Sequence, residues 1–175
     1  LVGIVTETDI LGAFIHQVES GHAPESWCQP ASTHMHSDPV TLDPNVEVGV
    51  ALDLCLQNHI RHLPVVEGGQ LIGLLSDRDI RLGLARSSIN DAQAQSEGRL
   101  SIPNIRVFSV MSQFVIPIEP THFLVDAATI MVKNKISALP VVSKGKLLGM
   151  LTQTDILRHF AAHFAEGDSS KRDLA

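Results

Sequence analysis

The sequence predicts an α/β fold built from two tandem copies of a strand-helix-strand-strand-helix unit. Residues 35–82 align with residues 111–158 without a gap at a constant offset of 76, and fifteen of the 48 aligned pairs are identical. Within each copy, runs rich in β-branched residues alternate with runs whose apolar residues recur at helical spacing. Self-similarity at a fixed period is typical of a repeat architecture, so the two copies are expected to share one local fold.

Each copy begins with a short extended run, residues 39–42 in the first and 115–118 in the second. An acidic residue and a proline follow in both, Asp43–Pro44 and Glu119–Pro120, a pair that suits the start of a helix. A helix with one buried face is therefore expected next. Its apolar stripe is expected at Val48, Ala51, Leu52 and Cys55 in the first copy and at Leu124, Ala127, Ala128 and Met131 in the second.

Two β-rich runs complete the sheet of each copy. In the first copy these are residues 62–67 and 70–76, joined by Gly68–Gly69, and Lys144–Gly145 holds the matching place in the second copy. Two-residue loops of this composition predict tight hairpins. The second helices are expected at residues 77–86 and 153–164.

A third, partial copy lies at the front, where LVGIVTETDI (residues 1–10) resembles LIGLLSDRDI (71–80) and LLGMLTQTDI (147–156). Its apolar face is expected to be covered by the two-repeat core or by a neighbouring chain, because an exposed apolar strand edge favours aggregation. The chain opens at Leu1, inside an apolar run, so we expect a fragment of a longer protein. The expected organisation is a truncated repeat with a linker (1–27), a first full repeat (28–90), a polar linker (91–104), a second full repeat (105–166) and a polar tail (167–175).

Composition excludes several classes of function. A formal net charge of −6 repels the phosphates of nucleic acids, so no nucleic-acid partner is expected. The apolar runs are far shorter than the roughly 20 residues that a membrane helix needs, so no membrane partner is expected. The two cysteines, Cys28 and Cys55, are too few for a disulfide framework, which suits a reducing cytoplasm.

The order of elements, the L-P-V-V strands (residues 63–66 and 139–142) and the G-x-x-[ST]-x-x-D-I junction in three copies closely resemble the cystathionine β-synthase (CBS) domain family. The resemblance covers roughly residues 28–164 in full and 1–20 in part. It implies two repeats packed face to face with pseudo-two-fold symmetry as a Bateman module. It further implies clefts that bind AMP, ADP, ATP, S-adenosylmethionine or related ligands, and no chemistry of its own.

The junction pairs have two interpretations that are compatible. A hydroxyl and an acid three residues later form a helix capping box. Alternatively, the carboxylate accepts the ribose 2′- and 3′-hydroxyls while the Ser or Thr hydroxyl supports it, and the glycine three residues upstream of the hydroxyl admits a backbone or a ligand. The pairs are Ser76 with Asp79, Thr152 with Asp155, and Thr6 with Asp9; the first two are the expected ribose-binding pairs.

Basic residues distinguish the first repeat from the second. Arg61, His62 and Arg78 are candidate phosphate ligands, since a guanidinium matches phosphate oxygens and histidine can donate a hydrogen bond. A solvated strand end is the alternative explanation for Arg61 and His62. The second repeat has Ser137, Ala138 and Thr154 at these places, so the first site is expected to favour phosphate more strongly. The resemblance also implies an adenine pocket lined by Val40, Thr41, Pro64, Ile116, Pro117 and Pro140.

Nine histidines invite a metal interpretation, since His159 and His163 lie four apart on an expected helix. No helical His-Glu-x-x-His motif or cysteine cluster accompanies them, and no catalytic nucleophile motif is present, so we expect neither a metal site nor an enzyme. The function predicted from the sequence is a regulatory module that needs no cofactor and binds an adenine nucleotide. We expect it to form a homodimer and to control an effector domain or partner protein. A ligand-free interaction module and a metal-assisted enzyme are the rival interpretations.

Overall fold

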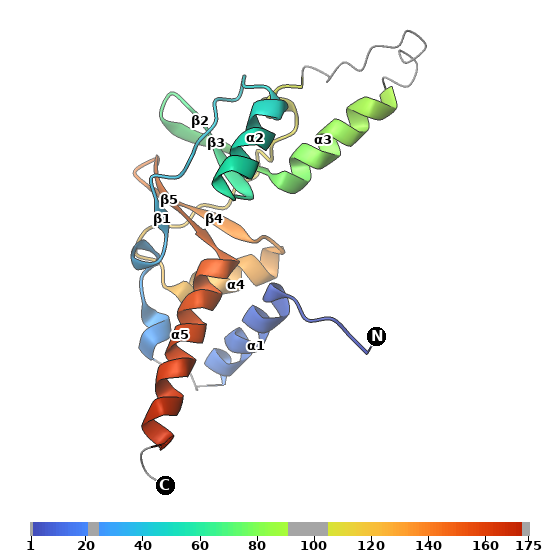
Figure 1. The fold of residues 1–175 in the computed structure, drawn as a ribbon. Coiled ribbons are helices and arrows are strands. Elements are labelled where there is room, and N and C mark those ends of the chain that lie inside the picture. The colour runs from blue at the N-terminus through green and yellow to red at the C-terminus, as the bar shows by residue number, and fades with distance from the viewer. Residues whose placement is uncertain (1, 21–24, 91–104, 173–175) are drawn as a thin grey trace. The chain divides into compact units, whose positions relative to one another are not determined.

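The computed structural model describes residues 2–20, 25–90 and 105–172. The expected polar linker at 91–104 lies outside the described residues. The chain divides into two compact units. Unit 1 comprises residues 1–38 and 116–175, and unit 2 comprises residues 39–115 (Figure 1).

Unit 2 contains an antiparallel hairpin with two helices beside it (Figure 1). Gly68 and Gly69 both have positive φ, +57° and +81°, as a tight two-residue hairpin loop requires, so the predicted hairpin is confirmed. The elements are α2 (Val48–Asn58), β2 (His62–Glu67), β3 (Gln70–Ser76), α3 (Asp77–Asn90) and a short 3-10 turn, η5 (Val107–Ser109).

The core of unit 2 forms where the apolar stripe of α2 meets the hairpin. Val48, Ala51 and Cys55 are buried as the helical spacing predicts, and Leu52 packs against them half-buried. Burial, with a smaller contribution from the charge of Asp77, raises the pKa of the Cys55 thiol. Cys55 therefore acts as a small apolar core residue.

Unit 1 contains a three-stranded sheet in the order β1-β5-β4 and three helices that contact one another. Lys144 and Gly145, which join β4 to β5, have φ of +49° and +79°, so this hairpin matches the one in unit 2. The elements are α1 (Glu7–Glu19), η1 (Glu25–Cys28), η2 (Ala31–Thr33), β1 (His36–Ser37), α4 (Leu124–Asn134), β4 (Ala138–Ser143), β5 (Lys146–Thr152) and α5 (Gln153–Arg172).

The partial repeat at the front contributes α1, which packs against α4 and α5 (Figure 1). Leu11 is fully buried, and Phe14 meets the rings of Trp27 and Phe160 at centroid distances of 5.4 and 5.1 Å. The expectation that the core covers the apolar face of this segment is therefore confirmed for the helix. Residues 2–5, expected as a strand, have no regular secondary structure, and Ile4 is 85% exposed.

The first residues of each repeat lie on the hairpin of the other repeat. In unit 1, β1 of the first repeat pairs antiparallel with β5 of the second, with His36 opposite Met150. In unit 2, Ser112 of the second repeat bridges to Leu74 of the first through two hydrogen bonds of 2.9 Å. Each compact unit therefore combines residues of both repeats.

Glycine at one strand position permits this close approach. A Cβ at Gly149 would lie 2.7 Å from the carbonyl oxygen of His36, and a Cβ at Gly73 would lie 3.1 Å from that of Ser112. The upstream glycine in the junction of each full repeat thus admits another backbone, one of the two possibilities that the sequence left open.

The structure corrects two boundaries of the repeat unit. Asp43–Pro44 does not start a helix, because the Asp43 carboxylate accepts the N–H of Asn45 at 2.8 Å in a turn, and α2 begins only at Val48. In the second repeat α4 likewise begins at Leu124, after Glu119–Pro120. The expected first strands are reduced to single parallel bridges, Leu42 to Val65 and Ile118 to Val141.

The second helix of each repeat is longer than expected. Helix α3 ends at Asn90 rather than near residue 86, and α5 continues to Arg172, beyond residue 164 and into the segment expected as a polar tail. The residues of α5 include no proline and a single glycine, Gly167, so the local sequence contains no strong signal that would end this helix early.

Candidate functional site

The junction of the first repeat is a complete capping box at the start of α3. The Asp79 carboxylate oxygen Oδ2 accepts the Ser76 N–H at 3.0 Å and the Ser76 hydroxyl at 2.6 Å, and the Asp79 N–H donates to Ser76 Oγ at 3.2 Å. The structural interpretation of this motif is therefore confirmed. Among the described residues, none donates a hydrogen bond to the other oxygen, Oδ1, and the Asp79 side chain is half-buried.

The other two junctions have the same geometry. Thr152 donates its N–H and hydroxyl to Asp155 Oδ2 at 2.9 and 2.6 Å, and Thr6 donates to Asp9 Oδ2 at the same two distances. The hydrogen bonds from Thr6 lower the pKa of Asp9. In all three copies, one carboxylate oxygen stabilises the helix start and the second oxygen is not needed by the cap.

The second oxygen distinguishes the two full repeats. Asp155 is 7% exposed, and its Oδ1 lies 2.9 Å from Nε2 of His36 and 3.6 Å from a guanidinium nitrogen of Arg158. The sequence patterns did not predict that either residue lies beside Asp155. The signal was present at the offset of 76, where His36 aligns with Ser112 and Arg158 with Leu82.

The three basic candidates of the first repeat surround its junction in unit 2. His62 is paired with Ser76 across β2 and β3, the Asp77 N–H donates to the Arg61 carbonyl at 3.0 Å, and Arg78 lies in the first turn of α3. Arg61 and Arg78 are exposed. Burial, and next the positive charge of Arg61, lower the pKa of His62, so its ring is neutral at neutral pH and can donate one hydrogen bond.

The expected adenine-pocket residues fall into two matching groups. In unit 2, the Leu42 N–H donates to the Pro64 carbonyl at 2.9 Å, which brings Val40 and Thr41 beside Pro64. In unit 1, the Ile118 N–H donates to the Pro140 carbonyl at 2.9 Å, which brings Ile116 and Pro117 beside Pro140. Both prolines are buried, whereas Val40, Thr41, Ile116 and Pro117 are exposed.

In the second repeat, the residues that replace the basic group make other contacts. The Gln153 N–H donates to the carbonyl of Ser137 at 3.0 Å, and Ala138 is buried at the start of β4. Thr154 donates its hydroxyl to a Glu7 carboxylate oxygen on α1 at 3.0 Å. Thr154, which aligns with Arg78, is therefore hydrogen-bonded to the partial repeat.

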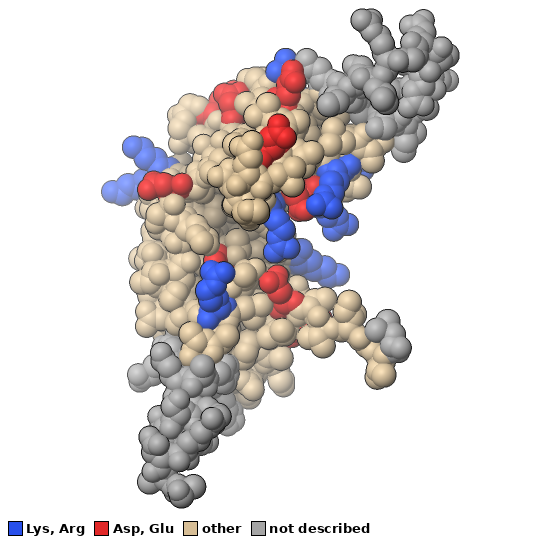
Figure 2. Space-filling model, in the orientation of Figure 1, with Lys and Arg blue, Asp and Glu red and all other residues tan. Residues whose placement is uncertain are grey.

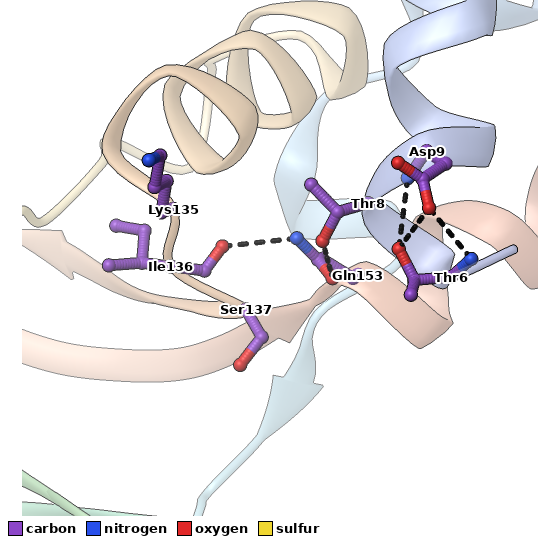
Figure 3. A pocket seen from close by; sticks show the side chains of 7 residues that line it. All are labelled: Thr6, Thr8, Asp9, Lys135, Ile136, Ser137 and Gln153. Atoms are coloured by element: carbon purple, nitrogen blue, oxygen red, sulfur yellow. Dashed lines mark hydrogen bonds between the residues drawn. The ribbon is translucent and has the colours of Figure 1, made fainter. Parts of the chain in front are cut away.

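A pocket of about 440 Å³ in unit 1 is lined by residues of the partial repeat and of the second full repeat. Figure 3 shows the junction of α1 on one side, the entry to β4 on the other, and Gln153 between them. Gln153 is buried, donates to the Ile136 carbonyl at 3.2 Å and accepts the Thr8 hydroxyl at 3.4 Å. The lining residues are Thr6, Thr8, Asp9, Lys135, Ile136, Ser137 and Gln153.

The histidines do not assemble a metal site within the described part of the chain. The rings of His34 and His159 lie 4.2 Å apart, and burial and the proximity of His159 lower the pKa of His34. The side chain of His163, the second member of the expected helical pair, lies outside the described residues. His36 contacts a carboxylate instead.

Charges of both signs share the face shown in Figure 2, where Lys and Arg side chains lie beside Asp and Glu side chains. Among the described residues drawn there, the basic side chains do not form the continuous stripe that is typical of a surface that binds a phosphate backbone. Of the helices in the described segments, none has the length and apolar character required to cross a membrane.

Known proteins with the same repeat were identified by sequence. The CBS domain pattern matches residues 31–86 and 107–162. The chain is 27% identical to the protein MJ1225 of Methanocaldococcus jannaschii over 92% of its own length, and it spans 55% of that protein. It is 35% identical to a CBS domain-containing protein of Dictyostelium discoideum, covering 67% of this chain and 81% of that protein.

Solved structures show the same fold. The crystal structure of MJ1225 superposes with a TM-score of 0.75 over 91% of this chain and 55% of that one, at 27% identity. The CBS domain pair of protein MJ0100, in complex with 5′-methylthioadenosine and S-adenosyl-L-methionine, superposes with a TM-score of 0.63 at 25% identity, covering 75% and 99% of the two chains. CBSX2 in complex with AMP superposes with a TM-score of 0.62 at 26% identity, covering 78% and 98%.

These matches agree with the internal repeat, the paired hairpins and the three capped junctions. The predicted α/β fold of tandem repeats is therefore confirmed. Two CBS domains, at residues 31–86 and 107–162, account for both full repeats, and the chain belongs to the CBS domain family as a CBS domain pair.

Proposed function

We propose that this CBS pair is a non-catalytic regulatory module that binds adenine-containing nucleotides or nucleosides. The observation that carries the proposal is the second carboxylate oxygen of Asp79, which the capping box leaves available for a donor. A ribose presents two adjacent hydroxyl donors, and a carboxylate is the acceptor used for such a pair in other nucleotide-binding folds. MJ0100 and CBSX2, which share the fold, carry adenosine derivatives in their crystal structures.

The surroundings of Asp79 favour a ligand with a phosphate. Arg61 and Arg78 bring two permanent positive charges to the same junction, and His62 adds a neutral donor because its pKa is lowered. Charge-assisted hydrogen bonds contribute roughly 1.5–3 kcal/mol each, against about 1 kcal/mol for neutral ones. The first site is therefore proposed to bind AMP, ADP or ATP more tightly than adenosine.

The proposed mechanism of regulation is a population shift. A nucleotide that binds one arrangement of the protein better than another favours that arrangement by its differential affinity and by no more. The responding element is an effector domain or a partner protein, and association of two copies as a homodimer is part of the same proposal. None of this requires a cofactor or a bond-making step.

Calorimetric titration with AMP, ATP, adenosine and S-adenosylmethionine tests the proposal. Asp79→Asn retains an oxygen for the cap but turns an N–H₂ donor outward, so it should weaken AMP binding by about 10- to 100-fold, the effect of one hydrogen bond to a charged group. Ser76→Ala removes the capping hydroxyl and keeps the outward oxygen. It should lower stability by about 1 kcal/mol and affect affinity less.

Asp53→Asn is the matched control, because it makes the same charge change at an exposed position on α2. Equal AMP affinity in the Asp79→Asn and Asp53→Asn variants would contradict the ribose assignment. A ligand-free interaction module is the second candidate function, favoured by the fact that every junction forms a complete cap without a ligand. Light scattering that shows a stable dimer, together with no binding of any adenine ligand, would favour it.

A further inference from the structure

The crossed pairing of the repeats places one residue of each repeat next to the junction strand of the other. In unit 1, His36 lies opposite Met150, two residues before Thr152. In unit 2, its counterpart Ser112 lies opposite Leu74, two residues before Ser76. The two positions are equivalent at the offset of 76, but the residue types differ.

This difference changes what each junction carboxylate offers to a ligand. His36 Nε2 lies 2.9 Å from Asp155 Oδ1, the oxygen that the cap does not use. Ser112 instead donates its hydroxyl to the carbonyl of Phe114 at 3.3 Å, and no described residue hydrogen-bonds to Asp79 Oδ1. The outward carboxylate oxygen of Asp155 in the second repeat is thus engaged by His36, whereas that of Asp79 in the first repeat accepts no hydrogen bond from a described residue.

We propose that His36 is a specificity-determining residue that competes with the ligand for Asp155 and so makes the second site the weaker of the two. The inference rests on the proposed function, since it concerns the same carboxylates. A ribose hydroxyl that approaches Asp155 Oδ1 must share that oxygen with the imidazole or displace it. Nε2 donates in the cation and in one neutral tautomer, so the competition does not depend on a positive charge.

The exposure of His36 makes this competition reversible. The His36 side chain is 67% exposed and the Asp155 side chain only 6%, so the ring can turn into water while the carboxylate stays in place. Arg158 remains 3.6 Å from the same oxygen and keeps a positive charge beside it. Because the histidine of the pair is exposed, its contact with Asp155 is weak, and the affinity of the second site is expected to be lower by about three- to tenfold.

A reciprocal exchange tests the inference in the full chain, with AMP as the probe and calorimetry as the measurement. In an Asp79→Asn background, which reports the second site, His36→Ser should tighten AMP binding about three- to tenfold. In an Asp155→Asn background, which reports the first site, Ser112→His should weaken binding by a similar factor. His16 is an exposed histidine of α1, and His16→Ser is the control, which should leave the AMP affinity of both sites unchanged. Circular dichroism melts confirm that each variant is folded.

The outcomes separate the two proposals. If the parent chain binds AMP and loses binding with Asp79→Asn and Asp155→Asn combined, but His36→Ser leaves the second site unchanged, the competition is refuted and the proposed function stands. If no variant binds AMP, adenosine or S-adenosylmethionine, both are refuted. A direct readout is the ring ¹⁵N signals of His36, which should move on AMP addition in the parent and should be unaffected by AMP in Asp155→Ala.

Discussion

Gly149→Ala is expected to destabilise the protein, because the glycine marks the place where the start of one repeat lies against the hairpin of the other. The new Cβ would lie 2.7 Å from the carbonyl oxygen of His36 and equally close to the Met35 sulfur, so a backbone segment has to move. Overpacking of this kind costs about 1–3 kcal/mol. Alanine in a strand recovers about 0.5–1 kcal/mol relative to glycine, so the middle of the two ranges leaves a net loss of about 1 kcal/mol.

Gly73→Ala is the comparison at the equivalent position. The nearest atom there is the Met111 sulfur at 2.5 Å, part of a flexible side chain that can turn away, while the Ser112 carbonyl lies at 3.1 Å. The expected cost is smaller, about 0–1 kcal/mol.

Gly49→Ala in α2 is the control, because a Cβ there meets nothing within 4 Å, and it should stabilise the helix by about 1 kcal/mol. Urea unfolding of the three variants at fixed pH gives the comparison. A Gly149→Ala variant as stable as the parent, or less harmed than Gly73→Ala, would refute the reasoning.

Three further predictions concern pH, the core and a turn. Because burial and Arg61 lower the pKa of His62, the unfolded chain gains a proton before the folded chain as pH falls below about 6.5, so stability should decline from pH 7.5 to 5.5. Urea unfolding of the His62→Gln variant should show a smaller decline in stability over this pH range than the parent shows. An equal decline in both proteins would contradict the attribution of the pH dependence to His62. Phe160→Ala removes a buried ring stacked on Trp27 at 4.5 Å and should cost about 3–5 kcal/mol; a loss below 1 kcal/mol in thermal unfolding would argue against that core. Gly145→Ala, at φ +79° in open space, should cost about 1–2 kcal/mol from backbone strain alone, and an unchanged melting temperature would disprove this.

Local features of the fold were predictable because their physics is local. The loop pairs at 68–69 and 144–145 contain Gly68, Gly69 and Gly145, which tolerate positive φ, and the two strands of each hairpin flank the pair directly. The stripe of Leu124, Ala127 and Met131 is buried as its spacing requires. The helix starts were less predictable, because Asp43 bonds to the N–H two residues ahead and closes a turn instead of a helix.

In the candidate site, too, the local contacts were predictable from the sequence and the long-range contacts were not. The two residues of each capping pair are three positions apart, so the sequence alone specified these pairs, including the copy at Thr6 and Asp9 that lines a pocket. The contact of His36 with Asp155 joins residues 119 positions apart, and the cation at Arg158 became relevant only once that helix start was formed. The expectation that the first site favours phosphate more strongly rested on aligned positions within the repeats, which do not reveal that His36 and Arg158 lie beside Asp155.

The sequence by itself determined the repeated unit, its helices and hairpins, and the hydroxyl–carboxylate pair at every junction, because turn conformation, helical spacing and capping depend on residues a few positions apart. The tertiary structure decided which repeat contributes its first residues to which hairpin, and therefore that His36 lies 2.9 Å from Asp155 whereas Ser112 takes the equivalent place in the other unit. Such pairings depend on long-range packing and hydrogen bonding, for which the spacing of residues along the chain contains no direct signal.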